Sequence, residues 1–200
     1  MVIISGRIEE PLLDALFRFS SNPTLREAAQ SLLREDIQDA AVFVAEQVRL
    51  IAAREDEERR RQKRPLINWR EFYVGSVGIG LTPAKRSKRR FDWFAYAAWN
   101  TKPHRNVEKY CGEMRIMRAA KDVRCRHIGG LVVVGESQYD GGSGIQRWTL
   151  DPCEACRQLM REKYRRLFRQ DTLVLTAQPV SQLRILKTIP RLMHDHGESW

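Results

Sequence analysis

Asp151-Pro152-Cys153-Glu154-Ala155-Cys156 joins a predicted helix start at Asp151-Pro152 to a CxxC pair. Earlier in the chain, Cys111-Gly112-Glu113 places a third cysteine two residues before a glutamate. Three thiolates can hold Zn²⁺ and leave its fourth position open to water, as in a catalytic zinc site. Glu113 is close to a ligand without being one, so it could transfer protons there. We therefore predict one zinc ion per chain, with Glu113 as the catalytic residue and Cys111, Cys153 and Cys156 as the ligands.

The cysteines admit two other interpretations. A structural zinc site needs a fourth protein ligand, for which Cys125 and His127 are the candidates. Both follow the helix predicted around Cys111 and are flanked by arginines, and no second CxxC or CxxH accompanies them. A redox-active CxxC would explain neither Cys111 nor Glu113. The catalytic interpretation is favoured because the ligand number, the glutamate and the order of elements agree.

The rest of the chain alternates between helical and strand patterns. Residues 1 to about 65 are predicted to be helical, and residues 72–81 and 91–99 to form a β-hairpin around the basic turn 85–90. The later elements are a helix over 107–121, a buried strand over 130–135, a glycine-rich loop over 139–144, a helix from 151 to about 169, a strand over 172–176 and a helix over 182–194. This order predicts a mixed sheet with helices packed on it.

Composition narrows the class of protein. A chain of 200 residues with 42% hydrophobic residues can form one domain with a full core. It contains no apolar window long enough to cross a membrane, and its first residues do not resemble a signal peptide. We therefore expect a cytoplasmic protein. The net charge of +10 suggests an anionic partner, which keeps nucleic acid among the candidates.

These motifs resemble those of the cytidine deaminase superfamily, closest to the branch with three cysteine ligands. Cys111-Gly112-Glu113 is similar to the family's Cys-Ala-Glu. The stretch Pro152-Cys153-Glu154-Ala155-Cys156-Arg157-Gln158 is similar to its Pro-Cys-Gly-Ala-Cys-Arg-Gln, and Phe72-Tyr73-Val74-Gly75 resembles its FxVG strand. The resemblance covers about residue 36 to residue 195.

The resemblance implies an α/β fold. We expect a three-layer α/β/α cytidine deaminase-like domain with a five-stranded mixed sheet over residues 36–200, preceded by an N-terminal helical extension over residues 1–35. It also implies a homo-oligomer, either a dimer or a tetramer.

The resemblance also implies substrate-binding roles. Phe72 would stack on a pyrimidine, Asn100 would bind the ribose, and the Gly112 backbone would hold the base. The family's Asn-x-Glu is replaced by Asn100-Thr101-Lys102, so the acid that holds the ribose is a cation here. Lys102 and Arg105 could instead receive a phosphate, or they could be ordinary surface charge.

The predicted function is hydrolytic deamination of a cytosine-type base, most simply in cytidine or deoxycytidine, using zinc. One alternative is a deaminase of a nucleotide, a single-stranded nucleic acid or a modified nucleoside. Another is a deaminase fold without activity that binds nucleic acid or another partner, against which the intact Glu113 argues.

Overall fold

The computed structural model describes the backbone of residues 3–4, 35–67, 73–84, 87–100, 111–140, 145–179 and 183–200. The N-terminal helical extension predicted over residues 1–35 lies almost entirely outside these ranges. Phe72, Lys102 and Arg105 also lie outside them, so their predicted roles stay predictions.

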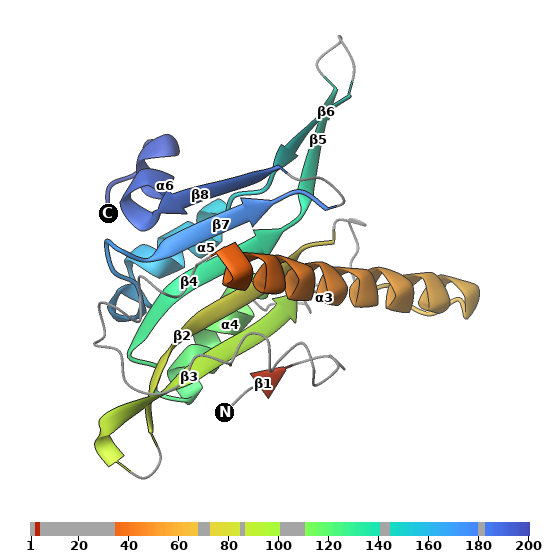
Figure 1. Cartoon of the computed structure of the whole chain (residues 1–200). Helices are drawn as coiled ribbons and strands as arrows, with labels where there is room; N and C mark the ends of the chain where they lie inside the picture. Colours follow the sequence, from red (N-terminus) through yellow and green to blue (C-terminus); the bar gives the residue numbers. More distant parts are fainter. Residues whose placement is uncertain are drawn as a thin grey trace.

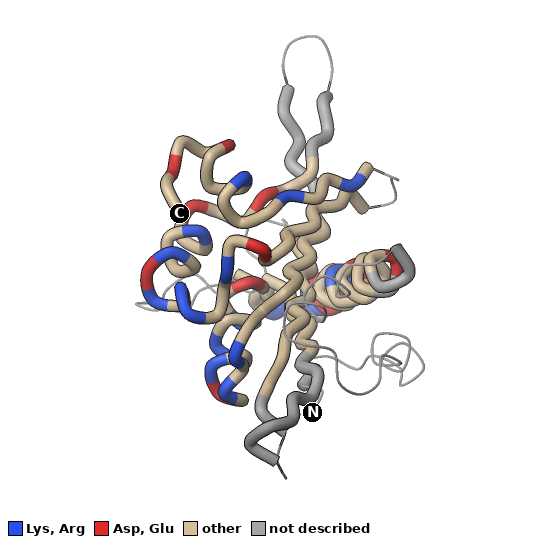
Figure 2. The backbone as a smooth tube through the Cα atoms, turned by 60° about the vertical axis from the view of Figure 1, so that its left-hand side comes forward, with Lys and Arg blue, Asp and Glu red and all other residues tan. Residues whose placement is uncertain are grey.

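A mixed sheet forms the middle layer of the fold (Figure 1). Its five main strands are β2 (Gly75–Ala84), β3 (Ser87–Trp99), β4 (His127–Val134), β7 (Leu173–Ala177) and β8 (Arg184–Thr188). They lie in the order β3-β2-β4-β7-β8, with β4 and β7 parallel and the other neighbours antiparallel. The two-residue strand β1 (Ile3–Ile4) pairs with β3 at one edge as a sixth strand. β2, β4 and β7 contain no Lys, Arg, Asp or Glu, and they form the tan centre of Figure 2.

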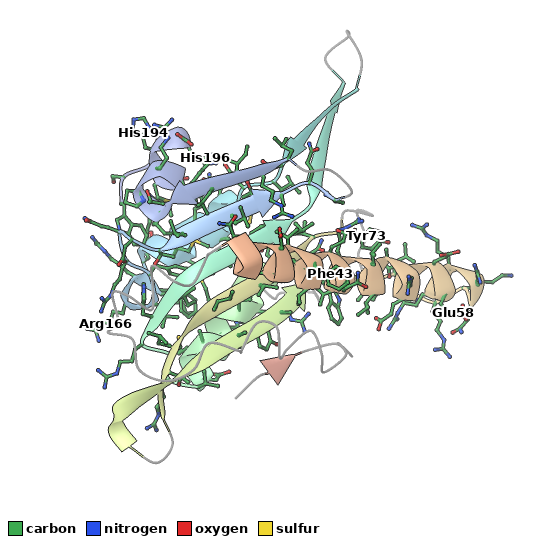
Figure 3. The ribbon with its side chains drawn as sticks, viewed as in Figure 1. Phe43, Glu58, Tyr73, Arg166, His194 and His196 are labelled. Carbon is green, nitrogen blue, oxygen red and sulfur yellow. The ribbon has the colours of Figure 1, made fainter. Side chains whose placement is uncertain are left out.

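Helices cover both faces of the sheet. On one face lies α3 (Glu35–Arg61), whose last turns extend past the strands at Glu58 (Figure 3). The other face carries α4 (Gly112–Asp122), α5 (Glu154–Arg161), the short 3-10 helix η1 (Arg165–Leu167) and α6 (Ile189–Asp195). Two separate apolar clusters result, one under α3 and one shared by α4, α5, η1 and α6. The predicted three-layer α/β/α fold is therefore confirmed.

None of the described helices combines the length and apolar content that a membrane crossing needs.

Glycines in β2 let helices approach the sheet from both sides. A Cβ atom at Gly75 would lie 1.7 Å from the carbonyl oxygen of Ala45 in α3. A Cβ atom at Gly78 would lie 2.2 Å from Cγ2 of Ile116 in α4. Since successive residues of a strand face opposite sides, these two positions set the spacing of two different layers. The small residues between the apolar ones in β2 therefore have a packing role.

The C-terminal region differs from the prediction. The helix expected over residues 182–194 is replaced by β8 and a shorter helix, α6. Residues 184–188 pair along their whole length with β7, and this tertiary pairing outweighs the local helical spacing of apolar residues. The helix begins only where the Thr188 side chain accepts a hydrogen bond from the Arg191 backbone and Pro190 occupies the first turn. β8 is the fifth main strand, which the local pattern did not predict.

Three other boundaries also shift. The glycine-rich loop predicted over 139–144 is flanked by an antiparallel hairpin, β5 (Glu136–Asp140) and β6 (Ile145–Thr149). The helix predicted to begin at Val107 begins at Gly112, because Cys111 has an extended backbone. The long helix predicted from residue 151 to about 169 is divided into α5, a turn and η1.

Candidate metal centre

Three of the four cysteines meet at one point. The Sγ atoms of Cys111 and Cys153 are 3.7 Å apart, and those of Cys111, Cys153 and Cys156 all lie within 4.8 Å of one another. None is in a disulfide. A tetrahedral zinc with Zn–S bonds of about 2.3 Å places neighbouring sulfurs about 3.8 Å apart. The group therefore has the size that a zinc ion needs, and the cysteines could hold a metal.

Two helix starts position the cysteines. Cys111 is the N-cap of α4 and Cys153 the N-cap of α5, each with an extended backbone (ψ of 154° and 160°). Neither side chain caps its own helix, so both sulfurs remain available to a cation. Cys156 lies in the first turn of α5 and is fully buried. The N-terminal dipoles of two helices therefore point toward the sulfurs, which favours thiolates.

Hydrogen bonds among the three cysteines shift their pKa values in opposite directions. Hydrogen bonds from the thiols of Cys111 and Cys156 lower the pKa of Cys153 to about 2. The same hydrogen bonding raises the pKa of Cys111 and of Cys156 above that of an ordinary thiol. A divalent cation would replace the shared protons and allow all three sulfurs to ionise.

Glu113 is buried beside the cysteines, in the first turn of α4, with 5% of its surface exposed. Burial raises its pKa to about 7, and the charge of Cys153 adds to the rise. A carboxyl group with a pKa near neutrality can both accept and donate a proton at physiological pH. This is the property that the predicted proton transfer requires.

The two other described substrate-binding candidates lie where β3 ends and α4 begins. Gly112 is buried, and a Cβ atom there would lie 3.0 Å from the carbonyl oxygen of Ala98 in β3. The side-chain oxygen of Asn100 accepts a hydrogen bond of 2.7 Å from the backbone of Val74, and the Asn100 backbone returns one to Val74. Asn100 thus joins the end of β3 to the segment before β2, and its ribose-binding role stays a prediction.

Cys125 and His127 do not join the metal group. The Cys125 thiol donates to the carbonyl oxygens of Leu81 (3.2 Å) and His127 (3.3 Å) in a buried site after the end of α4. The His127 Nε2 atom lies 4.0 Å from a carboxylate oxygen of Asp171. Within the described ranges, only Cys111, Cys153 and Cys156 form such a group. The interpretation that Cys125 or His127 completes a structural site is therefore excluded.

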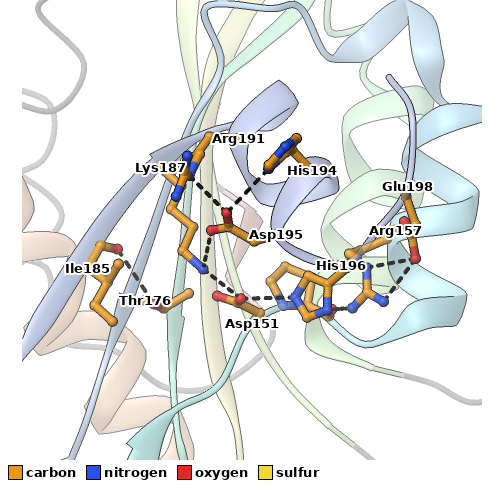
Figure 4. A network of polar contacts seen from close by, with 11 residues as sticks. Asp151, Arg157, Thr176, Ile185, Lys187, Arg191, His194, Asp195, His196 and Glu198 are labelled. Carbon is orange, nitrogen blue, oxygen red and sulfur yellow. Dashed lines mark hydrogen bonds and ion pairs between the residues drawn. The ribbon is translucent and has the colours of Figure 1, made fainter.

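A buried arginine holds the loop that carries Cys153. Arg157 donates a hydrogen bond of 2.6 Å to the carbonyl oxygen of Pro152, the residue before Cys153. It also donates from Nη2 (2.9 Å) and Nε (3.1 Å) to Glu198 near the end of the chain (Figure 4). The sequence motif includes Arg157, but no local pattern marks Glu198 as its partner.

Asp151 anchors the same loop from the other side. Its Oδ2 atom accepts from Lys187 Nζ in β8 at 2.8 Å and lies 3.0 Å from His196 Nε2 (Figure 4). Asp151 was expected to cap a helix, but Cys153 is the N-cap of α5. Its role is instead an ion pair with Lys187 and a hydrogen bond with His196, two residues that sequence reasoning missed.

Comparison with known proteins found similar solved structures. No family model matches the chain, and no curated protein matches it. Among solved structures, a crystal structure of cytidine deaminase from Burkholderia pseudomallei superposes with a TM-score of 0.49 and 18% sequence identity. The match covers 78% of this chain and 96% of that one.

Proposed function

We propose that this chain is a zinc-dependent hydrolytic deaminase that converts a cytosine-type base, in cytidine or deoxycytidine, to uracil and releases ammonia. The observation that carries the proposal is the group of Cys111, Cys153 and Cys156 with the buried Glu113 beside it. A structural or redox role for the cysteines would not require a buried carboxyl group with a pKa near 7.

In this proposal the chain supplies the ligands and the proton carrier. Cys111, Cys153 and Cys156 would hold Zn²⁺, which acts as a Lewis acid that makes water nucleophilic near neutral pH. Glu113 takes a proton from water and delivers it to the ring nitrogen. It then assists departure of the amino group, so that a C–N bond breaks and a C=O bond forms. The buried position of Glu113 limits exchange of this proton with solvent.

The metal is tested first. The purified protein should contain about one zinc per chain, and Cys111→Ser, Cys153→Ser and Cys156→Ser should each reduce the zinc content. Cys125→Ser is the matched control, because this thiol is buried away from the metal group and should not affect zinc. Elemental analysis that finds no zinc in the wild type, or equal loss in the control, would refute the site.

Substrate class is tested by ultraviolet absorbance on cytidine, deoxycytidine, their monophosphates and an oligonucleotide. Lys102 and Arg105 are proposed phosphate ligands in the nucleotide alternative. In that case Lys102→Glu should raise KM for the monophosphate and lower it for the nucleoside, because it restores a ribose-binding acid. Unchanged KM values for both substrates would exclude phosphate binding by Lys102 and would favour a nucleoside as the substrate.

The oligomeric state is tested separately. Light scattering should report a dimer or tetramer.

A further inference from the structure

A second charged region lies away from the three cysteines of the metal group, at the C-terminal end of α4 and after that of α5. It consists of two segments, residues 121–126 and 163–169, which we call the basic end. Its cations are all exposed: Lys121, Arg124, Arg126, Lys163, Arg165, Arg166 and Arg169. The two segments contain one exposed acid, Asp122, and two more exposed acids, Glu162 and Asp171, lie on either side of the second segment. Figure 2 shows the two segments as neighbouring blue stretches, and Arg166 projects at the left edge of Figure 3.

Hydrogen bonds hold the two segments together. The Thr172 hydroxyl donates to the carbonyl oxygen of Ile128 (2.8 Å) and accepts from the Arg169 backbone (2.9 Å). Ile128 belongs to β4, which begins directly after Arg126, so Arg126 and Arg169 belong to adjoining parts of one surface. Because Thr172 and Ile128 are fully buried, these hydrogen bonds attach the two segments to the core of the protein.

The cations of the basic end have no acidic partner within the part of the chain that the structure describes. None of the seven forms an ion pair with the residues that the structure describes. Cations in other parts of the structure do form ion pairs. Arg157 and Arg161 pair with Glu198. Lys187 pairs with Asp151 and Asp195. Unpaired like charges on one surface repel each other, and an external anion would relieve that repulsion.

The β2–β3 hairpin extends the same end of the molecule. The Thr82 hydroxyl donates to the carbonyl oxygen of Val123 (2.7 Å), and the Arg126 backbone donates to Leu81 (2.7 Å). β2 continues past Thr82, and β3 starts at Ser87 with the sequence Ser87-Lys88-Arg89-Arg90. The backbone of β3 thus begins beside the basic end.

We propose that the basic end binds the phosphodiester backbone of a nucleic acid, at a surface separate from the cysteine site. Five of its seven cations are arginines, whose guanidinium groups match the geometry of phosphate oxygens. Regularly spaced phosphates can neutralise several separated cations at once, whereas a small anion can neutralise only one or two. α4, with 11 residues, spans about 16 Å between this surface and the cysteines. Binding therefore does not require the metal site.

The test is fluorescence anisotropy of the full chain with a labelled 20-nucleotide single strand and with its duplex. The wild type should bind at least one of them, with affinity that falls as salt rises by a log–log slope of about −0.7 per phosphate contact on a single strand. Arg165→Gln/Arg166→Gln/Arg169→Gln should make this slope shallower by up to about 2 and raise Kd about tenfold or more at low salt. The relative affinities of the two probes report which form of nucleic acid is preferred.

The control carries the same charge change elsewhere. Arg54→Gln/Lys63→Gln/Arg64→Gln removes three exposed cations at the far end of α3, among Glu55, Glu57 and Glu58. It should retain wild-type affinity for both probes. Equal weakening by both triple variants would mean a general charge effect and would overturn the assignment. So would a failure to bind either probe, or equally tight binding of polyglutamate. Unchanged thermal unfolding would show that the variants are folded.

Discussion

Gly112 and Ser76 are matched in size where α4 meets β2. A Cβ atom at Gly112 would lie 2.8 Å from the Ser76 hydroxyl oxygen and 3.1 Å from its Cβ atom. The Ser76 side chain is fully buried, and its hydroxyl has no hydrogen-bond partner among the described residues. The serine therefore fills the space that a larger residue at position 112 would need.

This pair gives a double-mutant prediction. Gly112→Ala should destabilise the protein by about 1–3 kcal/mol through overpacking, and Ser76→Ala alone should be close to neutral because it removes an unpaired hydroxyl. The double variant should recover part of the loss, with the Ala98 carbonyl oxygen at 3.0 Å limiting the recovery. Chemical denaturation measures the three free energies of unfolding. Strictly additive effects would show that the two residues do not interact.

Replacing Glu113 should separate metal binding from turnover. Glu113→Gln keeps the size of the side chain but cannot carry a proton, so we expect kcat to fall by about 10²–10⁴ with zinc content unchanged. Glu154→Gln is the control, because Glu154 directly follows Cys153 and is exposed. A wild-type kcat in Glu113→Gln would remove this residue from the mechanism.

The pairing of Arg157 with Glu198 should control how firmly zinc is held. Glu198→Gln weakens the partner of the arginine that fixes the Pro152 carbonyl, so the Cys153 loop should move more freely. We expect faster zinc transfer to a chromogenic chelator, by severalfold. Glu162→Gln, which alters an exposed acid just after the same helix, should behave as the wild type. Identical release rates in all three proteins would contradict a positioning role.

Cys125 should make stability depend on alkaline pH. Burial raises its pKa from 9.0 to about 11, so the folded protein retains a proton that the unfolded chain releases. Ionisation of Cys125 in the unfolded chain should therefore lower the free energy of unfolding by on the order of 2 kcal/mol between pH 9 and pH 11. Below pH 9 this thiol should not make the free energy of unfolding depend on pH. Cys125→Ala should show a flatter profile in urea denaturation. Parallel profiles for the two proteins would exclude the contribution.

Local sequence patterns were sufficient to predict which cysteines come together and where most of the main strands lie. Each cysteine motif marks the beginning of a helix, and helix starts that meet over a sheet bring their first residues together. Val77 and Ile79 alternate with small residues in β2, and this spacing is typical of a strand covered on both faces.

Other features have no local signal. Glu136–Asp140 is a polar segment that becomes a strand only by pairing with Ile145–Thr149. Lys187, His196 and Glu198 act on the CxxC loop through ion pairs and hydrogen bonds whose partners are distant in sequence. Such contacts depend on where the backbone brings charges together, which composition and periodicity do not encode.

The anchors of the CxxC loop also set an order of events during synthesis. Asp151 contacts residues 36 and 45 positions further along, and Arg157 contacts one 41 positions further. A ribosome adding about 5–20 residues per second makes these partners a few seconds after the last cysteine. All three thiols are thus exposed to the cell before the loop that presents two of them is fixed. We expect stable zinc loading to follow synthesis of Lys187, His196 and Glu198.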